Sequence, residues 1–178
     1  MISSLRLLSL SLALLLAQHS LAIPPALDWM AAEVDLPKGS KVRIVPGPPN
    51  RIYPSVAPGT KAAAFGGTGS YLVLEDSGAN PALRFHNGDT ITIAAWIRCD
   101  RIAKDQNQYI IGKGRTHRDG FSRDNQNWAL RLRGHQGQGK LSFLFRSRDE
   151  KGSPGTYHRW TSKDGISPGS RWHHLVVT

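Results

Sequence analysis

The stretch Arg171-Trp172-His173-His174-Leu175-Val176-Val177-Thr178 is typical of a β-strand, because aromatic and β-branched residues fill it. The turn residues Ser167-Pro168-Gly169-Ser170 precede it. A second segment, Thr90–Cys99, alternates with a period of two, and one of its faces collects Ile91, Ile93, Ala95, Ile97 and Cys99. Apolar strands need partners along both edges. We therefore expect an all-β sandwich, of which this chain holds the front part.

Further short segments have strand character and are separated by turn residues. They are Lys41–Val45, Lys61–Phe65, Tyr71–Leu74, Tyr109–Gly112, Trp128–Arg133, Leu141–Phe145 and Tyr157–Thr161. Helical character is confined to one or two possible turns over Ala26–Val34. Several short strands at this spacing favour an antiparallel jelly-roll sandwich, incomplete in this chain.

The first 22 residues have the pattern of a secretory signal peptide. Arg6 supplies the positive charge, Leu7–Ala17 is an apolar run, and Ser20-Leu21-Ala22 offers a cleavage site. The apolar run is shorter than the roughly 20 residues that a membrane span requires. We therefore predict a secreted, periplasmic or extracellular protein without a membrane span. Residues 23–60 form a Pro-rich lead-in segment, and residues 61–178 form the jelly-roll domain.

Cys99 is the only cysteine in the sequence, which excludes a scaffold held by internal disulfides. It comes at the end of the alternating segment Thr90–Cys99. The position favours a small buried apolar residue, as free cysteines in proteins often are. The alternative is a thiol that pairs with a cysteine outside this chain.

The sequence is strongly basic, with a formal net charge of +10. The excess is uneven: from Arg98 onward there are 16 basic and 7 acidic residues, against 7 and 6 before it. Such a basic half suggests an acidic partner, such as an anionic polysaccharide, a cell-surface polymer or nucleic acid. The alternative is that solvated arginine keeps an exported β-protein soluble. Composition leaves both interpretations open.

Candidate binding residues lie in a long polar stretch and on one strand. Gly112–Asn127 is longer than a hairpin needs, and long loops on a rigid sheet often carry binding sites. Tyr157-His158-Arg159-Trp160 combines aromatic rings, which stack on sugars, with a guanidinium, which pairs with sulfate or carboxylate. Alternation places Tyr157 and Arg159 on one face and the other two on the opposite face, so a half-buried core position is the competing interpretation. The candidate ligand-binding residues are Arg115, His117, Arg118, Arg123, Arg131, Tyr157, Arg159 and Trp160.

No catalytic residue can be assigned from the sequence. Gly134–Lys140 matches the spacing of a phosphate loop, but Leu141 stands where that motif needs Ser or Thr, and a strand follows instead of a helix. We predict a glycine-rich hairpin turn there. Glycoside hydrolysis needs two carboxylates across the sugar bond. The three glutamates are scattered, and the nearest approach to a hydrolase motif, Glu33–Lys38, has lysine where the acid should be.

Metal binding is not indicated by any spacing of ligands. The neighbours His173 and His174 point to opposite faces of a strand, so they cannot hold one ion together. Calcium is possible through loop carboxylates, for which Asp76, Asp89 and Asp119 are candidates. No other cofactor is expected.

Five segments in order resemble laminin-G-like domains of the concanavalin A-like lectin and glucanase superfamily. They are residues 61–74 (KAAAFGGTGSYLVL), 90–97 (TITIAAWI), 110–114 (IIGKG), 128–143 with its glycine-rich turn, and 172–178 (WHHLVVT). The resemblance implies a jelly roll that binds carbohydrate or protein, often as one module of a large exported bacterial protein. It also implies further strands beyond residue 178, and it supplies no catalytic residue.

These observations favour a secreted, non-catalytic binding module whose partner is a glycan or another cell-surface polymer, with anionic glycan favoured. A cell-surface protein is a possible ligand, and no nucleic-acid partner is expected. One alternative is a structural scaffold that packs on neighbouring domains of a larger chain. A lesser alternative is part of a sandwich-fold glycoside hydrolase.

Overall fold

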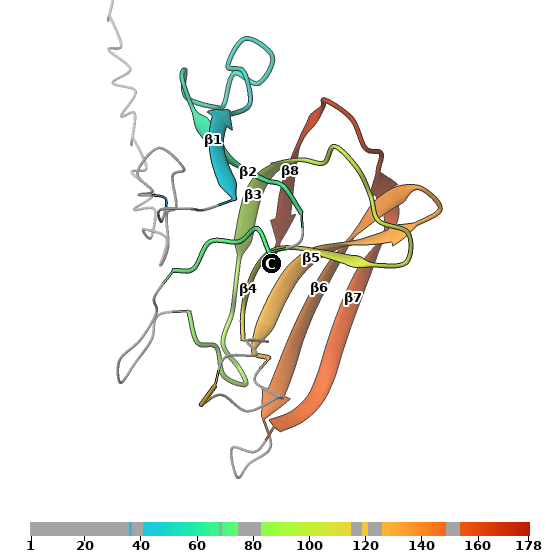
Figure 1. The fold of residues 1–178 in the computed structure, drawn as a ribbon. Coiled ribbons are helices and arrows are strands. Elements are labelled where there is room, and N and C mark those ends of the chain that lie inside the picture. Colours follow the sequence, from blue (N-terminus) through green and yellow to red (C-terminus); the bar gives the residue numbers. More distant parts are fainter. Residues whose placement is uncertain are drawn as a thin grey trace, which may run out of the picture.

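The computed structural model describes residues 36, 41–67, 69–74, 83–114, 119–120, 126–148 and 154–178. This part of the chain contains eight β-strands and no helix (Figure 1). The strands are β1 (Val42–Pro46), β2 (Lys61–Phe65), β3 (Ile93–Arg98), β4 (Asn107–Lys113), β5 (Trp128–His135), β6 (Gln138–Arg148), β7 (Pro154–Ile166) and β8 (Trp172–Val177). All pairings are antiparallel, as the sequence predicted.

The strands form three antiparallel sheets. β1 pairs with β2, β3 pairs with β8, and β4 to β7 form a meander in the order β4-β5-β6-β7. In the β3–β8 pair, Ile93 lies opposite Val177 and Ala95 opposite Leu175. The two segments that suggested a sandwich in the sequence are thus direct neighbours in space.

The core lies between the β3–β8 pair and one face of the four-stranded sheet. Trp128 and Leu130 of β5 and Phe143 of β6 are buried there. Ile93 and Val177 of the β3–β8 pair pack against this cluster. Trp128 also donates its indole Nε1–H to the carbonyl of Leu83 at 2.9 Å, which fixes the preceding loop on the core.

The Pro-rich lead-in contacts the outer side of the β3–β8 pair. The ring of Tyr53 meets the ring of Trp96 edge-on, with 5.0 Å between the centroids. The Tyr53 hydroxyl lies 3.2 Å from the carbonyl oxygen of Trp172 and 3.3 Å from its amide nitrogen. A single tyrosine thus joins this segment to both β3 and β8.

The structure changes several strand boundaries that the sequence suggested. β2 has the expected ends, whereas β6 and β7 extend beyond them. Only Ile93–Arg98 of the segment Thr90–Cys99 is paired, because β8 is no longer than this. The expected strand Tyr71–Leu74 is wrong: these residues have no strand partner, and three of their four side chains are exposed. The helical turns expected over Ala26–Val34 lie outside the described residues.

The glycine-rich segment between β5 and β6 is a hairpin turn, as predicted. Its central residues, Gln136 and Gly137, both have positive φ angles, of 48° and 77°. Two positive φ angles are the signature of the tight hairpin turn that matches strand twist. A phosphate loop needs a helix after its glycines, and here β6 follows. No helix long and apolar enough to cross a membrane occurs among the residues described.

A cationic sheet face as the candidate functional site

The four-stranded sheet carries an unbalanced set of charges. Its strands contain eight Lys and Arg residues and one carboxylate, Asp164. The cations are Lys113, Arg131, Arg133, Lys140, Arg146, Arg148, Arg159 and Lys163. Asp164 lies in the irregular part of β7, where the pairing with β6 shifts between Lys140 and Ser142. The basic excess of the sequence is therefore concentrated on one structural element.

The register of the strands brings five of these cations onto one face. Arg133 lies opposite Lys140, Leu144 opposite Arg159, and Arg146 opposite Tyr157. Arg131 lies between Tyr109 of β4 and Ser142 of β6. Residues two apart on a strand share a face, so all of these side chains stand on the side away from the core. We call the set of Arg131, Arg133, Lys140, Arg146 and Arg159, with Tyr109 and Tyr157, the cationic face.

Two arginine–tyrosine pairs cross neighbouring strands on this face. The Arg146 guanidinium lies 4.4 Å from the centroid of the Tyr157 ring, and its Nη1 donates to the Tyr157 hydroxyl at 3.3 Å. The Arg131 guanidinium lies 5.8 Å from the Tyr109 centroid, and its Nη1 donates to the Tyr109 hydroxyl at 3.3 Å. Cation–π contacts of this kind orient the rings and the charges together.

The centre of the cationic face is buried and its rim is exposed. Arg131 and Ser142 retain 2% and 0% of their accessible surface. Arg133 and Arg159 are exposed, and Tyr109 and Tyr157 each keep 48%. A ligand that approaches from solvent would thus meet the two exposed guanidinium groups and the two half-exposed phenol rings first.

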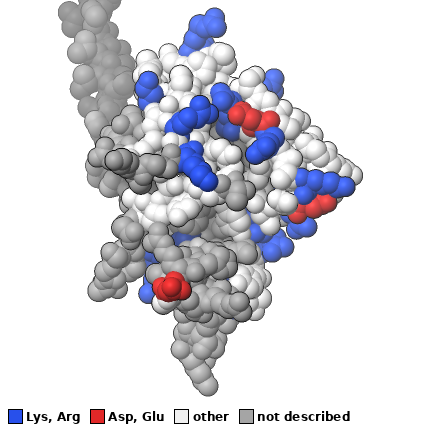
Figure 2. All heavy atoms as spheres, viewed as in Figure 1, with Lys and Arg blue, Asp and Glu red and all other residues white. Residues whose placement is uncertain are grey.

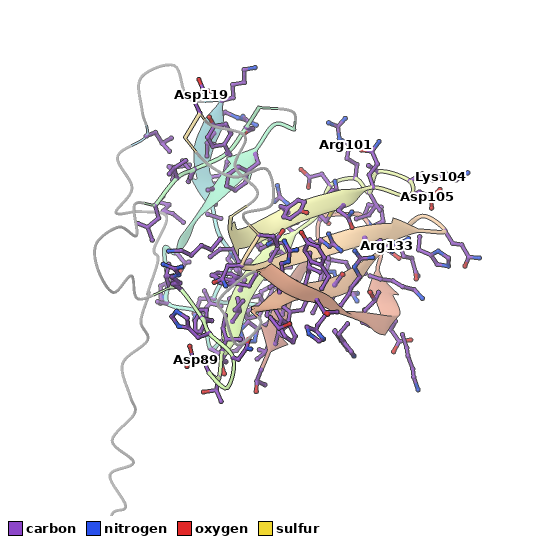
Figure 3. All side chains as sticks on the ribbon, turned by 90° about the horizontal axis from the view of Figure 1, so that it is seen from below. Asp89, Arg101, Lys104, Asp105, Asp119 and Arg133 are labelled. Atoms are coloured by element: carbon purple, nitrogen blue, oxygen red, sulfur yellow. The ribbon has the colours of Figure 1, made fainter. Side chains whose placement is uncertain are left out.

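The ion pairs found in the described part of the chain lie away from this face. Arg98 pairs with Asp100 at 3.2 Å, and the Nδ1 of His86, which is charged only if the ring is protonated, lies 3.5 Å from the Asp89 carboxylate. Figure 2 shows basic side chains more widely spread than acidic ones over the surface seen from that side. In Figure 3, Arg133 lies near the end of the sandwich from which Arg101, Lys104 and Asp105 also project. Cations outnumber carboxylates among these labelled residues, which favours a positive potential in this region.

A cavity of about 710 Å³ opens on the other side of the four-stranded sheet, beside β8. Its apolar lining includes Phe143, Phe145, Trp160, Val176 and Val177. The ring of Phe145 is stacked on that of His158, with 4.8 Å between the centroids. Of the cationic-face residues, Arg146 also lines this cavity.

Comparison with known families now bears on this arrangement. A family model described as the concanavalin A-like lectin/glucanases superfamily, of the laminin-G type, matches residues 65–178. The chain belongs to this laminin-G-like family. The match confirms the resemblance seen in the five sequence segments, and the all-β antiparallel fold agrees with it. No curated protein and no solved structure matches the chain.

The laminin-G-like fold separates the binding residues that the sequence suggested. Tyr157 and Arg159 share the cationic face, whereas Trp160 lines the cavity on the opposite side and is 56% exposed. Arg131 also belongs to the cationic face, where its side chain is buried. Four further candidates lie outside the described residues: Arg115, His117, Arg118 and Arg123.

Sequence reasoning missed four residues of the cationic face: Tyr109, Arg133, Lys140 and Arg146. Tyr109 and Arg133 fall within predicted strands, and Lys140 and Arg146 lie next to one, so side-chain alternation could have indicated their faces. The pairing between strands could not be read from the sequence. Only this pairing shows that Arg146 stands beside Tyr157 and Lys140 beside Arg133.

The two candidate calcium ligands that the structure describes, Asp89 and Asp119, are not brought together in this laminin-G-like domain. Asp89 accepts a hydrogen bond from the His86 amide at 2.7 Å and pairs with its ring, so it closes a local turn. Asp119 is exposed and lies on the opposite side of the molecule in Figure 3. Asp76 lies outside the described residues. Across the described segments, no three metal-ligating side chains converge.

The two neighbouring histidines point to opposite sides of β8, as predicted. His173 lies opposite Ile97 on the core side. His174 is exposed and stacks on Trp96, with 4.9 Å between ring centroids. The pair therefore cannot close on one ion.

The Cys99 thiol is half-buried. Its Sγ donates to the carbonyl of Arg101 at 3.0 Å. Burial raises the pKa of the thiol, and the nearby Asp100 carboxylate reinforces this effect. A thiol with a raised pKa stays protonated at neutral pH and reacts slowly.

Proposed function

We propose that this chain is an exported, non-catalytic binding module whose cationic face holds an anionic polysaccharide. The observation that carries the proposal is the ratio of eight cations to one carboxylate in β4–β7, with five of the cations on one face. Export through the leader at residues 1–22 is part of the proposal. Laminin-G-like domains often bind glycans or proteins, which fits this role.

The chemistry of the cationic face suits a sulfated or uronic glycan. Guanidinium groups pair with two oxygens of a sulfate or carboxylate at once. The half-exposed rings of Tyr109 and Tyr157 offer apolar faces on which sugar rings stack. These aromatic and charged groups lie at the rim of one sheet face, so an extended polymer could contact several strands together.

Catalysis is not part of the proposal, because hydrolysis of a glycosidic bond needs a pair of carboxylates. Asp164 is the only carboxylate in β4–β7, and it lies in a bulge rather than on a regular face. The superfamily also contains glucanases, so membership alone does not decide this point.

Binding to a sulfated polysaccharide, measured over a salt series, tests the proposal. The variant Arg133→Ala/Arg159→Ala removes two exposed cations from the cationic face. The variant Arg43→Ala/Arg84→Ala removes two exposed cations elsewhere and serves as a control of equal net charge. Exposed ion pairs contribute about 0.2–1 kcal/mol each, so the first variant should bind roughly two- to thirtyfold more weakly.

The control variant should bind like the wild type, and wild-type affinity should fall as salt rises. Equal weakening in both variants would show that net charge alone attracts the polymer. No binding by the wild type at low salt would reject the proposed function and favour a scaffold that packs on neighbouring domains.

A further inference from the structure

We propose that Arg131 forms an anion subsite in the floor of the cationic face, which takes the sulfate or carboxylate group of a bound sugar. The inference deepens the proposed function and rests on it for the identity of the polymer. Sulfate and carboxylate groups are both oxyanions, and each offers at least two oxygens to one guanidinium.

The Arg131 guanidinium is a buried charge without an ion pair among the described residues. An arginine side chain remains charged at all physiological pH values. Arg131 retains only 2% of its accessible surface, and it has no ion pair in the described part of the structure. Its Nη2 is buried and has no hydrogen-bond partner among the described residues. Buried charges in proteins are normally paired, so this group requires an explanation.

The hydrogen bonds that Arg131 makes are long and go to neutral hydroxyl groups. Its Nε donates to the Ser142 hydroxyl at 3.4 Å, and its Nη1 donates to the Tyr109 hydroxyl at 3.3 Å. Both acceptors are neutral, and both distances exceed the 2.7–2.9 Å typical of a guanidinium bound to an anion. Within the described part of the chain the guanidinium is therefore held in place but not neutralised, which is the condition expected of an anion-binding group without its anion.

Other cations surround Arg131 on the cationic face. Arg133 stands two residues along the same strand and face, and Lys140 lies opposite it. Arg159 stands on the same face, opposite Leu144. Cations at these positions repel one another, and a bound anion would reduce this repulsion. A sulfate or carboxylate at the Nη2 of Arg131 would offset this repulsion as well as satisfy the open donor.

Access to the subsite would come past Tyr109. Its ring lies over the Arg131 guanidinium and is 48% exposed. Rotation of the Tyr109 side chain would break the hydrogen bond between its hydroxyl and Arg131. Such a rotation would uncover the guanidinium, and the displaced ring could then stack on the sugar that carries the anion.

The test compares the full chain with three variants. Arg131→Lys keeps the charge and removes the forked donor, Arg131→Met removes the charge at similar volume, and Arg43→Lys is the matched exchange at an exposed arginine outside the cationic face. Thermal midpoints are measured in sodium sulfate and in sodium chloride of equal ionic strength. Sulfate stabilises many folds by exclusion, so the difference between variants is the relevant quantity.

We expect sulfate to raise the midpoint of the wild type and of Arg43→Lys by several degrees more than that of either Arg131 variant. Without sulfate, Arg131→Met should be as stable as the wild type or more stable, because an uncompensated buried charge is removed. A large loss of stability in Arg131→Met would show that the guanidinium is structural and would overturn the proposal. An equal sulfate effect in all four proteins would indicate an adventitious ion only.

The anion could be a group on a sugar or a free inorganic ion. Measuring binding to a sulfated oligosaccharide and to its desulfated form distinguishes these two sources. If the sugar carries it, Arg131→Lys should weaken binding of the sulfated form by about tenfold or more and leave the desulfated form unchanged. If Arg131→Lys binds like the wild type while Arg133→Ala/Arg159→Ala does not, the subsite is rejected and the proposed function stands. A sulfate effect through Arg131 without any oligosaccharide binding would retain the subsite, for a free anion, and reject the glycan.

Discussion

Replacement of Leu130 by alanine should test whether β5 joins the two layers of the sandwich. The Leu130 side chain is fully buried, with 0% of its surface exposed. It lies in the cluster with Trp128 and Phe143, against which Ile93 and Val177 of the other layer pack. Removal of a buried leucine leaves a cavity that neighbouring side chains only partly fill, at a cost of about 2–5 kcal/mol.

Because Leu130 has no exposed surface, we expect a loss near 3 kcal/mol in the free energy of unfolding. Domains are stable by about 5–15 kcal/mol, so this would be a large part of the total. For a chain of this length it corresponds to a fall of about 6–12 °C in the thermal midpoint. Urea denaturation followed by circular dichroism would measure the free energy, and tryptophan fluorescence would report the core through Trp128.

The matched control is Val176→Ala. Val176 stands on the outer side of β8 and is 49% exposed, so its truncation should cost less than about 1 kcal/mol. Equal losses in the two variants would contradict the packing of β5 against the β3–β8 pair. A loss below about 1 kcal/mol for Leu130→Ala would do the same.

Two further predictions concern the glycine contacts and the thiol. Gly134→Ala should lower the free energy of unfolding by about 1–3 kcal/mol or more in urea denaturation, because the new Cβ would overlap the backbone carbonyl of Ala103. Gly137→Asn should change it by less than about 1 kcal/mol, since that turn position has open space and a φ angle that asparagine tolerates. Cys99 should react with iodoacetamide at pH 8 more slowly in the native chain than in urea, because burial raises its pKa above the ordinary value of 9.0. Equal alkylation rates in the native and unfolded states would contradict the burial of the thiol. The free energy of unfolding should also fall as the pH rises past that value, because the unfolded state then releases the thiol proton first.

The fold could be predicted where alternation and turn residues agreed. β2 and β8 were located closely because both are short and follow clear turns. The side-chain directions in β3 were also correct, since Ile93 and its alternating neighbours face the core. Tyr71–Leu74 has the same apolar character but no partner, and a strand requires a partner as well as a composition.

The register of β4 against β5 shows why the candidate site could not be predicted in full. Strict alternation would place Tyr109 and Ile111 on the same face. The irregularity between them moves Ile111 opposite Leu130 on the core side and leaves Tyr109 opposite Arg131 on the cationic face. A β-bulge of this kind depends on the partner strand, so the sequence of one strand does not reveal it.

The position of Arg131 also bears on the two interpretations of the basic excess that composition left open. Solubility is improved by charges that face solvent and mix both signs. Arg133 and Arg159 could serve that purpose, because they are exposed. Arg131 cannot, since it is buried on a face whose paired positions include no Asp or Glu. Among the described residues this charge is removed from water and has only neutral partners, an arrangement that costs stability. The proposed binding of an anion at this face would offset that cost, whereas solubility would not.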